Sequence, residues 1–91
     1  MIIKLHKPVE HDGKSITEIN FDLDSLTGVD LEQVEKEFVA AGHSGLLPDT
    51  SKVYQAMVAA RACGLPYETI RLLGAKDYSR ATLHVLTFLA S

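Results

Sequence analysis

The 91-residue sequence has a single cysteine, no long apolar run and no excess of positive charge. Because Cys63 stands alone, no internal disulfide can form, and a structural zinc site would depend mainly on dispersed histidines. No apolar run approaches the roughly 18 residues that span a bilayer, and the N-terminus lacks the long apolar core of a signal peptide. We therefore expect a protein of a reducing cytosol, neither exported nor embedded in a membrane.

The charge balance is slightly acidic, with nine Lys and Arg against twelve Asp and Glu and a net charge of -3. No overall positive field would attract phosphate backbones or anionic lipids, so neither nucleic acid nor a membrane is an expected partner. Hydrophobic residues make up 46% and charged residues 23%, as in ordinary globular domains rather than disordered chains. The chain should therefore fold, and its length fits one domain over residues 1–91.

The residue types that carry chemistry form no recognisable catalytic or metal-binding pattern. Ser44 lacks a nucleophile-elbow pattern and an identifiable base, and Cys63 falls near a predicted helix C-terminus, where no helix dipole lowers a thiol pKa. The histidines are scattered without a close ligand pair: His6, His11, His43 and His84. The sequence thus predicts no enzyme, no cofactor and no metal site.

Residues 2–22 predict a β-hairpin. β-forming residues alternate with polar ones on both sides of Asp12-Gly13, a dipeptide typical of two-residue turns. An isolated two-stranded hairpin is only marginally stable, so its apolar face must lie on the helices or pair with another chain. Four side chains are expected on that face: Ile3 and Leu5, opposite Ile19 and Phe21.

The helical spacing of apolar residues over 30–91 predicts three to four helices, so the fold class is α+β, an N-terminal β-hairpin followed by a helical bundle. Glycines and capping residues mark their ends. The predicted helices run from Asp30, as the cap, to Gly42; from a cap at Asp49, Thr50 or Ser51 to Cys63, before Gly64; from Leu65-Pro66 to Leu73; and from near Asp77 onward. Their inward positions are Leu31, Val34, Phe38 and Ala41; Val53, Met57 and Ala60; and Ile70 and Leu73.

The last predicted helix is apolar on nearly all sides. Tyr78, Ala81, Val85 and Phe88 fall on one face, whereas Leu83, Leu86 and Leu89 fall on others. Such a helix is normally buried on several sides, and a short chain has few elements with which to cover it. Either part of this helix contacts another polypeptide, or the hairpin and the other helices cover it completely. The candidate partner-binding residues are Leu83, Leu86, Phe88 and Leu89, with Ile16 on the hairpin.

Residues 57–73 offer an alternative, a DNA-reading helix-turn-helix. Ala60-x-x-x-Gly64 followed by Ile70 has the small-residue, turn-glycine and core spacing of that motif. The segment 66–71, which would read the duplex, carries Arg71 as its one cation, whereas DNA binding usually requires several phosphate contacts. Two packed helices joined by a glycine turn explain the same residues.

Several short motifs together resemble a known family. The chain opens with Leu5-His6-Lys7-Pro8-Val9, then Asp12-Gly13 and Ile16-Thr17-Glu18-Ile19; later come Gly28-x-Asp30, Gly64-Leu65-Pro66, Leu73 before Asp77-Tyr78, and a final Phe88-Leu89. This order resembles the small tail assembly chaperones of long-tailed phages, the Mu-like group. Their usual start is a Leu-x-x-Pro-Ile/Val segment, then Asp-Gly and an Ile/Val-Thr-Glu-Leu/Ile strand. The resemblance covers almost the whole chain.

The resemblance implies a non-enzymatic role in the cytoplasm of the host bacterium. Such a chaperone coats the long hydrophobic tape measure protein, helps to recruit tail tube subunits and is absent from the mature virion. Two other functions stay open, a structural tail or connector subunit and a small helix-turn-helix DNA-binding regulator. The sequence also leaves open whether the chain forms a homo-oligomer.

Overall fold

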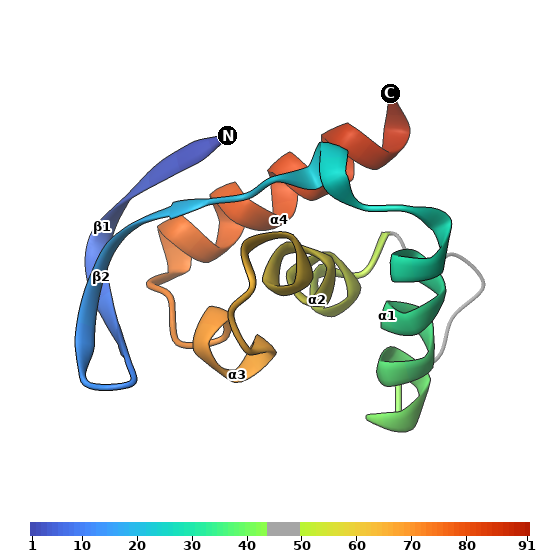
Figure 1. Cartoon of the computed structure of the whole chain (residues 1–91), viewed down its shortest axis with the longest axis horizontal. Helices are drawn as coiled ribbons and strands as arrows, with labels where there is room; N and C mark the ends of the chain where they lie inside the picture. The colour runs from blue at the N-terminus through green and yellow to red at the C-terminus, as the bar shows by residue number, and fades with distance from the viewer. Residues whose placement is uncertain (44–49) are drawn as a thin grey trace.

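A computed structural model describes residues 1–43 and 50–91. It confirms the predicted α+β fold, in which an N-terminal antiparallel hairpin precedes the helices (Figure 1). The elements are β1 (Ile2–His11), β2 (Lys14–Asn20), a 3-10 turn η1 (Leu23–Ser25), α1 (Gly28–Ala40), α2 (Lys52–Cys63), α3 (Tyr67–Ile70) and α4 (Ala75–Ala90). Most of the loop predicted over 43–49, including Ser44 and the candidate cap Asp49, lies outside the described residues.

The hairpin turns at Asp12-Gly13, as predicted. Both residues have positive φ, 53° and 76°, which is the left-handed geometry of a tight hairpin turn. Ile3 pairs with Ile19, and both side chains are buried. The register then shifts, because β1 has four residues between Lys4 and Val9 where β2 has one between Ile16 and Glu18. β1 therefore has an irregular bulge over residues 5–8, for which no pairing with β2 is found.

A buried carboxylate of α4 holds this bulge. Asp77 is 1% exposed, and its Oδ2 accepts hydrogen bonds from the backbone N–H groups of His6 at 2.8 Å and Lys7 at 3.2 Å. Arg80 Nη1 donates to Asp77 Oδ1 at 3.2 Å and to the Lys4 carbonyl oxygen at 2.9 Å. Backbone groups of β1 that have no partner on β2 thus form hydrogen bonds with side chains of α4.

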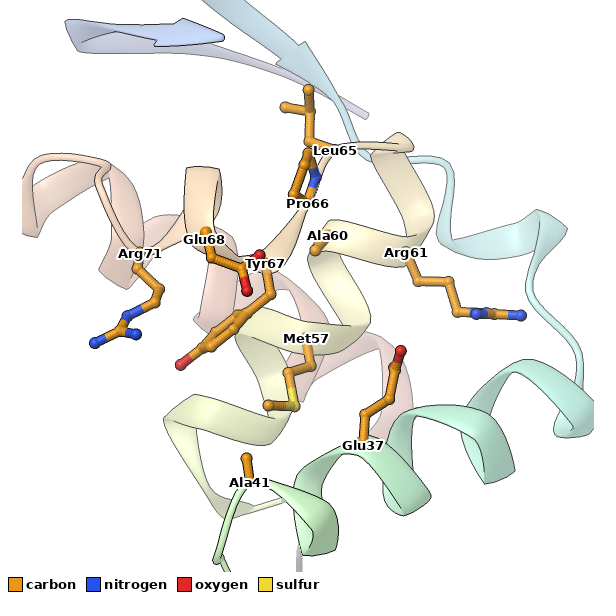
Figure 2. A pocket seen from close by; sticks show the side chains of 10 residues that line it. All are labelled: Glu37, Ala41, Met57, Ala60, Arg61, Leu65, Pro66, Tyr67, Glu68 and Arg71. Atoms are coloured by element: carbon orange, nitrogen blue, oxygen red, sulfur yellow. The ribbon is translucent and has the colours of Figure 1, made fainter. Parts of the chain in front are cut away.

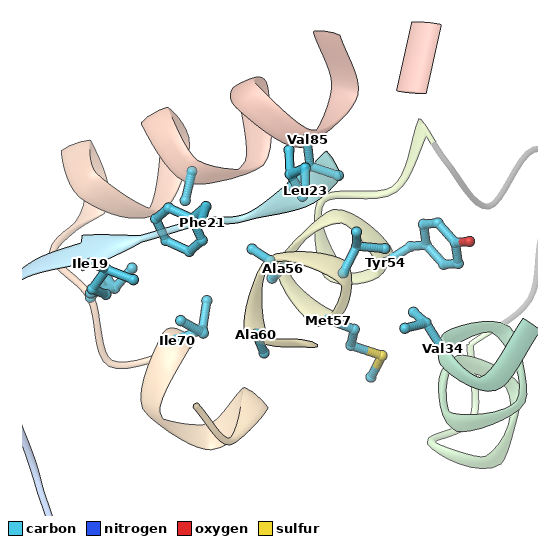
Figure 3. Close-up of a cluster of buried hydrophobic side chains, with 14 of the residues drawn as sticks. Ile19, Phe21, Leu23, Val34, Tyr54, Ala56, Met57, Ala60, Ile70 and Val85 are labelled. Atoms are coloured by element: carbon cyan, nitrogen blue, oxygen red, sulfur yellow. The ribbon is translucent and has the colours of Figure 1, made fainter. Parts of the chain in front are cut away.

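The core is centred on α2, which the hairpin and α1 flank on opposite sides (Figure 3). Every residue from Tyr54 to Ala60 is buried. The predicted stripe of Val53, Met57 and Ala60 was therefore too narrow, and Val53 is only half-buried. Small side chains such as Ala56 and Ala59 let neighbouring elements approach α2 from several directions, which a one-face pattern does not anticipate.

The start of α1 differs from the prediction. Thr27, not Asp30, is the N-cap, and Asp30 lies in the first turn. The Asp30 carboxylate accepts hydrogen bonds from the Thr27 N–H at 2.8 Å and from its hydroxyl at 3.3 Å, and Arg61 Nε donates to it at 2.7 Å. An acidic residue three positions after the cap can reach back to the cap backbone, so Asp30 has the residue type of a cap although Thr27 holds that position.

The short third helix is also smaller than predicted. α3 is limited to Tyr67–Ile70, and Pro66 precedes it as the N-cap rather than lying in its first turn. Ile70 and Leu73 still point into the core, at 0% and 6% exposed. The predicted stop after α2 is confirmed, because Gly64 adopts a left-handed φ of 74°. Among the described helices, none has both the length and the apolar character that crossing a membrane requires.

Candidate partner-binding surfaces

α4 has one buried face and one exposed face, which corrects the prediction that it is apolar on nearly all sides. Ala81 and Val85 are 1% and 0% exposed and pack into the core. Lys76, Arg80 and Thr87 are exposed on the opposite face. Their helical spacing places these polar side chains together on the side of α4 that faces solvent. Leu83 lies among them and is 60% exposed.

The five candidate binding residues do not form one surface. Leu83 and Leu86 are three residues apart on α4 and therefore lie on the same side of the helix, Leu83 exposed and Leu86 half-buried. Phe88 and Leu89 are half-buried and pack against the core. Ile16 does the same from the hairpin, where it pairs with the buried Val9. Only the pair formed by Leu83 and Leu86, here called the α4 patch, faces away from the core.

A groove lies between α1, α2 and α3 (Figure 2). Its volume is about 570 Å³. Met57 and Ala60 form an apolar floor and are only 8% and 4% exposed. The lining residues are Glu37 from α1 and Ala41, its C-cap; Met57, Ala60 and Arg61 from α2; and Leu65, Pro66, Tyr67, Glu68 and Arg71 in and around α3.

Some charged side chains around the groove already contact other side chains, and others would be free to pair with a ligand. Arg61 is paired with Asp30, and the guanidinium carbon of Arg71 lies 5.7 Å from the centroid of the Tyr67 ring, a cation–π distance. Glu37 and Glu68 are exposed, and neither carboxylate makes a hydrogen bond or ion pair within the described residues. Among the described residues the groove is therefore lined by two unpaired carboxylates and one guanidinium without a carboxylate partner, that of Arg71, so the balance is negative. Figure 2 shows the two carboxylates on opposite sides of Met57.

Sequence reasoning missed this groove. Its floor residues were predicted to be ordinary core positions of one helix, and its walls come from two other helices. No linear spacing links Glu37 to Glu68, so the assembled fold alone brings them around one floor. The available signal was the pair Met57 and Ala60, a flexible and a small side chain on one face of α2, without a partner predicted to cover them.

Burial shifts the pKa values of the titratable side chains of Cys63 and His84. Cys63 is half-buried, its Sγ lies 3.5 Å from the Ala60 carbonyl oxygen, and burial raises the pKa of its thiol. Burial also lowers the pKa of His84, assisted by the positive N-terminus. Within residues 1–43 and 50–91, no three His, Cys, Asp or Glu side chains are grouped as a metal site would require.

The helix-turn-helix alternative has little structural support. The element that would enter the major groove is α3, a single turn of four residues. Arg71, the C-cap of α3, lies over the Tyr67 ring, and α3 itself contains no Lys or Arg. A recognition helix normally presents several base- and phosphate-contacting side chains.

One comparison with known proteins gave a match. The family model described as "Phage tail assembly chaperone proteins, E, or 41 or 14" matches residues 2–90, nearly the whole chain. Neither the curated proteins nor the solved structures contain a match. The match extends over both the hairpin and all the described helices, so it includes the α4 patch and the groove.

Proposed function

The chain belongs to the family of phage tail assembly chaperone proteins, and from this premise we propose that it binds the tape measure protein during tail assembly and catalyses no reaction. Membership of this family indicates protein partners and a role in the host cell while the tail is built. Binding of the tape measure protein in the host cytoplasm, with release before the virion matures, is the finer part of the proposal. The tail tube protein is a second proposed partner.

The exposure of the α4 patch is the observation that carries this proposal. Leu83 is 60% exposed in the middle of an otherwise polar helix face, and Leu86 adjoins it. Burying a leucine side chain against an apolar partner contributes roughly 1.5–3 kcal/mol. A hydrophobic segment of the tape measure protein would cover these two side chains and be kept from aggregation in return. We propose Phe88, Leu89 and Ile16, which pack at the edge of the core outside this patch, as further contacts with the partner.

A structural tail subunit is the second candidate. An exposed leucine also suits a permanent contact inside a particle, and a homo-oligomer would bury it equally well. The two candidate functions predict different locations for the protein. A chaperone is recovered with the tape measure protein before assembly and is missing from purified virions. A structural subunit is present in them.

Co-expression with the tape measure protein tests the proposal. Tagged wild-type chain should retain soluble tape measure protein in a pull-down, and Leu83→Asp should lower the amount recovered about tenfold, the effect of losing roughly 1.4 kcal/mol. Leu72→Asp is the matched control, since Leu72 is 70% exposed outside the α4 patch. Circular dichroism must show all three proteins folded.

The possible results distinguish whether the chain binds the tape measure protein from whether the α4 patch is the surface that binds it. If wild-type chain neither binds the tape measure protein nor increases its solubility, the chaperone function proposed for this pair is overturned and the structural subunit becomes the leading candidate. If Leu83→Asp and Leu72→Asp both bind as wild type does, the tape measure protein docks on another surface.

A further inference from the structure

We infer that the groove between α1, α2 and α3 is a separate docking site for an amphipathic helix that presents large apolar side chains flanked by Lys or Arg. This site is distinct from the α4 patch, and the inference does not require the tape measure protein to be the partner. It rests on the shape, floor and charge of the groove.

The floor of the groove suits an inserted apolar side chain. Met57 is a flexible, polarizable side chain that adapts to different shapes, and Ala60, one helical turn away, leaves depth beside it. Both lie on the α2 surface between the two walls (Figure 2). Leu65 and the Tyr67 ring extend this apolar surface along one wall. A volume of about 570 Å³ falls within the range of pockets that bind ligands and side chains.

The arrangement of the walls favours a helix over an extended strand. α1 and α3 supply the two walls and α2 the floor, and the groove's lining includes no residue of β1 or β2. An incoming chain therefore has no strand edge to pair with there, so main-chain pairing cannot hold it. Helix-in-groove binding instead places apolar side chains from one face of the ligand into such a floor.

Charge decides which kind of helix fits. Glu37 on one wall and Glu68 on the other have no ion-pair partner among the described residues, whereas Arg61 is already paired with Asp30. Arg71, which lies over the Tyr67 ring, is the one lining cation without a carboxylate partner there, so two carboxylates face one guanidinium. Lysine or arginine beside the apolar positions of a ligand would meet both carboxylates. An acidic ligand would face two unpaired negative charges instead. Complementary charge of this kind sets specificity more than affinity.

Two synthetic helical peptides of 16 residues provide the probe. They share leucines spaced three and four residues apart and differ only in their flanking residues, lysine in one and glutamate in the other. The chain has two methionines, so ¹³C-methyl labelling gives one signal from the groove, Met57, and one from outside it, Met1, which is 57% exposed. The lysine peptide should shift the Met57 signal saturably and leave Met1 unchanged.

Charge reversal supplies the decisive variant. Glu37→Lys combined with Glu68→Lys should reverse the preference, so that the glutamate peptide binds at least tenfold more tightly than the lysine peptide. Glu32→Lys combined with Glu35→Lys changes the net charge equally but lies outside the groove, on the exposed side of α1. This control should retain the preference of the wild-type protein. All four residues are exposed, so the fold should tolerate both variants.

Three results would overturn the inference. The first is a Met57 signal that neither peptide shifts. The second is an equal effect of the groove variant and its control, which would mean attraction by net charge alone. The third is self-association that the groove variant abolishes while no peptide binds, which would assign the groove to a second copy of the chain. None of these results bears on whether Leu83 binds the tape measure protein.

Discussion

The hairpin and α1 lie on opposite sides of α2 and are held there by different chemistry (Figure 1). The hairpin combines apolar packing with a buried carboxylate, because Asp77 binds two backbone N–H groups of β1. α1 relies on the apolar side chains of Val34 and Phe38, while the ion pair between Asp30 and Arg61 is partly exposed. A buried polar contact fails sharply when one partner is removed, whereas apolar packing loses free energy in proportion to the atoms removed.

The largest effect is expected from Asp77→Ala. The substitution leaves the His6 and Lys7 N–H groups in the bulge without these partners and removes the carboxylate paired with Arg80, so the free energy of unfolding should fall by about 3 kcal/mol. Urea unfolding measures this loss. Asp77→Asn retains one acceptor oxygen and should lose less. A loss below about 1 kcal/mol for Asp77→Ala would show that water replaces the carboxylate. The contacts that hold the hairpin would then not be more sensitive to a single substitution than those that hold α1.

A smaller effect is expected from Val34→Ala on the other side of α2. Val34 is 1% exposed, and removing two buried methyl groups should cost about 2 kcal/mol. Native-state hydrogen exchange sharpens the comparison, because protection should decrease first in α1 for this variant and first in the hairpin for Asp77→Ala. Equal loss of protection in both regions, for both variants, would mean that the two sides of α2 unfold as one unit.

The smallest effect is expected from Asp30→Asn, and it should depend on pH. The hydrogen bond from the Thr27 backbone, with help from Arg61, lowers the pKa of Asp30 below its usual value of 3.8. A carboxyl whose pKa is lower in the folded state stabilises the fold above the unfolded-state pKa, and this contribution is lost as the pH falls through the folded-state value. Asp30→Asn should therefore unfold more easily than wild type at neutral pH, with the difference shrinking in acid.

Urea unfolding at neutral pH and at about pH 2.5 measures that difference. Glu32→Gln is the matched control, since it removes an exposed carboxylate of the same helix that has no partner among the described residues. A difference for Asp30→Asn that stays constant with pH would contradict the assigned role of its charge.

The features that depend on neighbours in sequence were predictable. The Asp12-Gly13 turn and the stop at Gly64 follow from backbone preferences of one or two residues, and the pairing of Ile3 with Ile19 follows from alternation. The exact cap of α1 was missed because Thr27 and Asp30 are both good capping residues at the spacing of a capping box. The family was also predictable, because its motifs run in order along the chain.

The features that depend on distant residues were not predictable. The sequence places Asp77 near the start of a helix, whereas its carboxylate accepts a hydrogen bond from His6 of β1, 71 residues away. The exposure of Leu83 and the partial burial of Leu86 depend on where α4 meets the other elements, and helical spacing alone could not rank them. The groove forms only where α1, α2 and α3 meet, so the sequence does not show that Glu37 and Glu68 lie beside the same floor residues.

The Asp77 clamp also has a consequence for synthesis on the ribosome. Both strands emerge first, yet the carboxylate that completes the β1 bulge emerges about 70 residues later, so this contact closes nearly the longest loop that the chain allows. A nascent chain stalled after α3 holds the hairpin sequence without its polar anchor. The part of the hairpin that packs on α4 would then be exposed to chaperones and proteases until α4 follows, and the fold would be complete only when α4 docks.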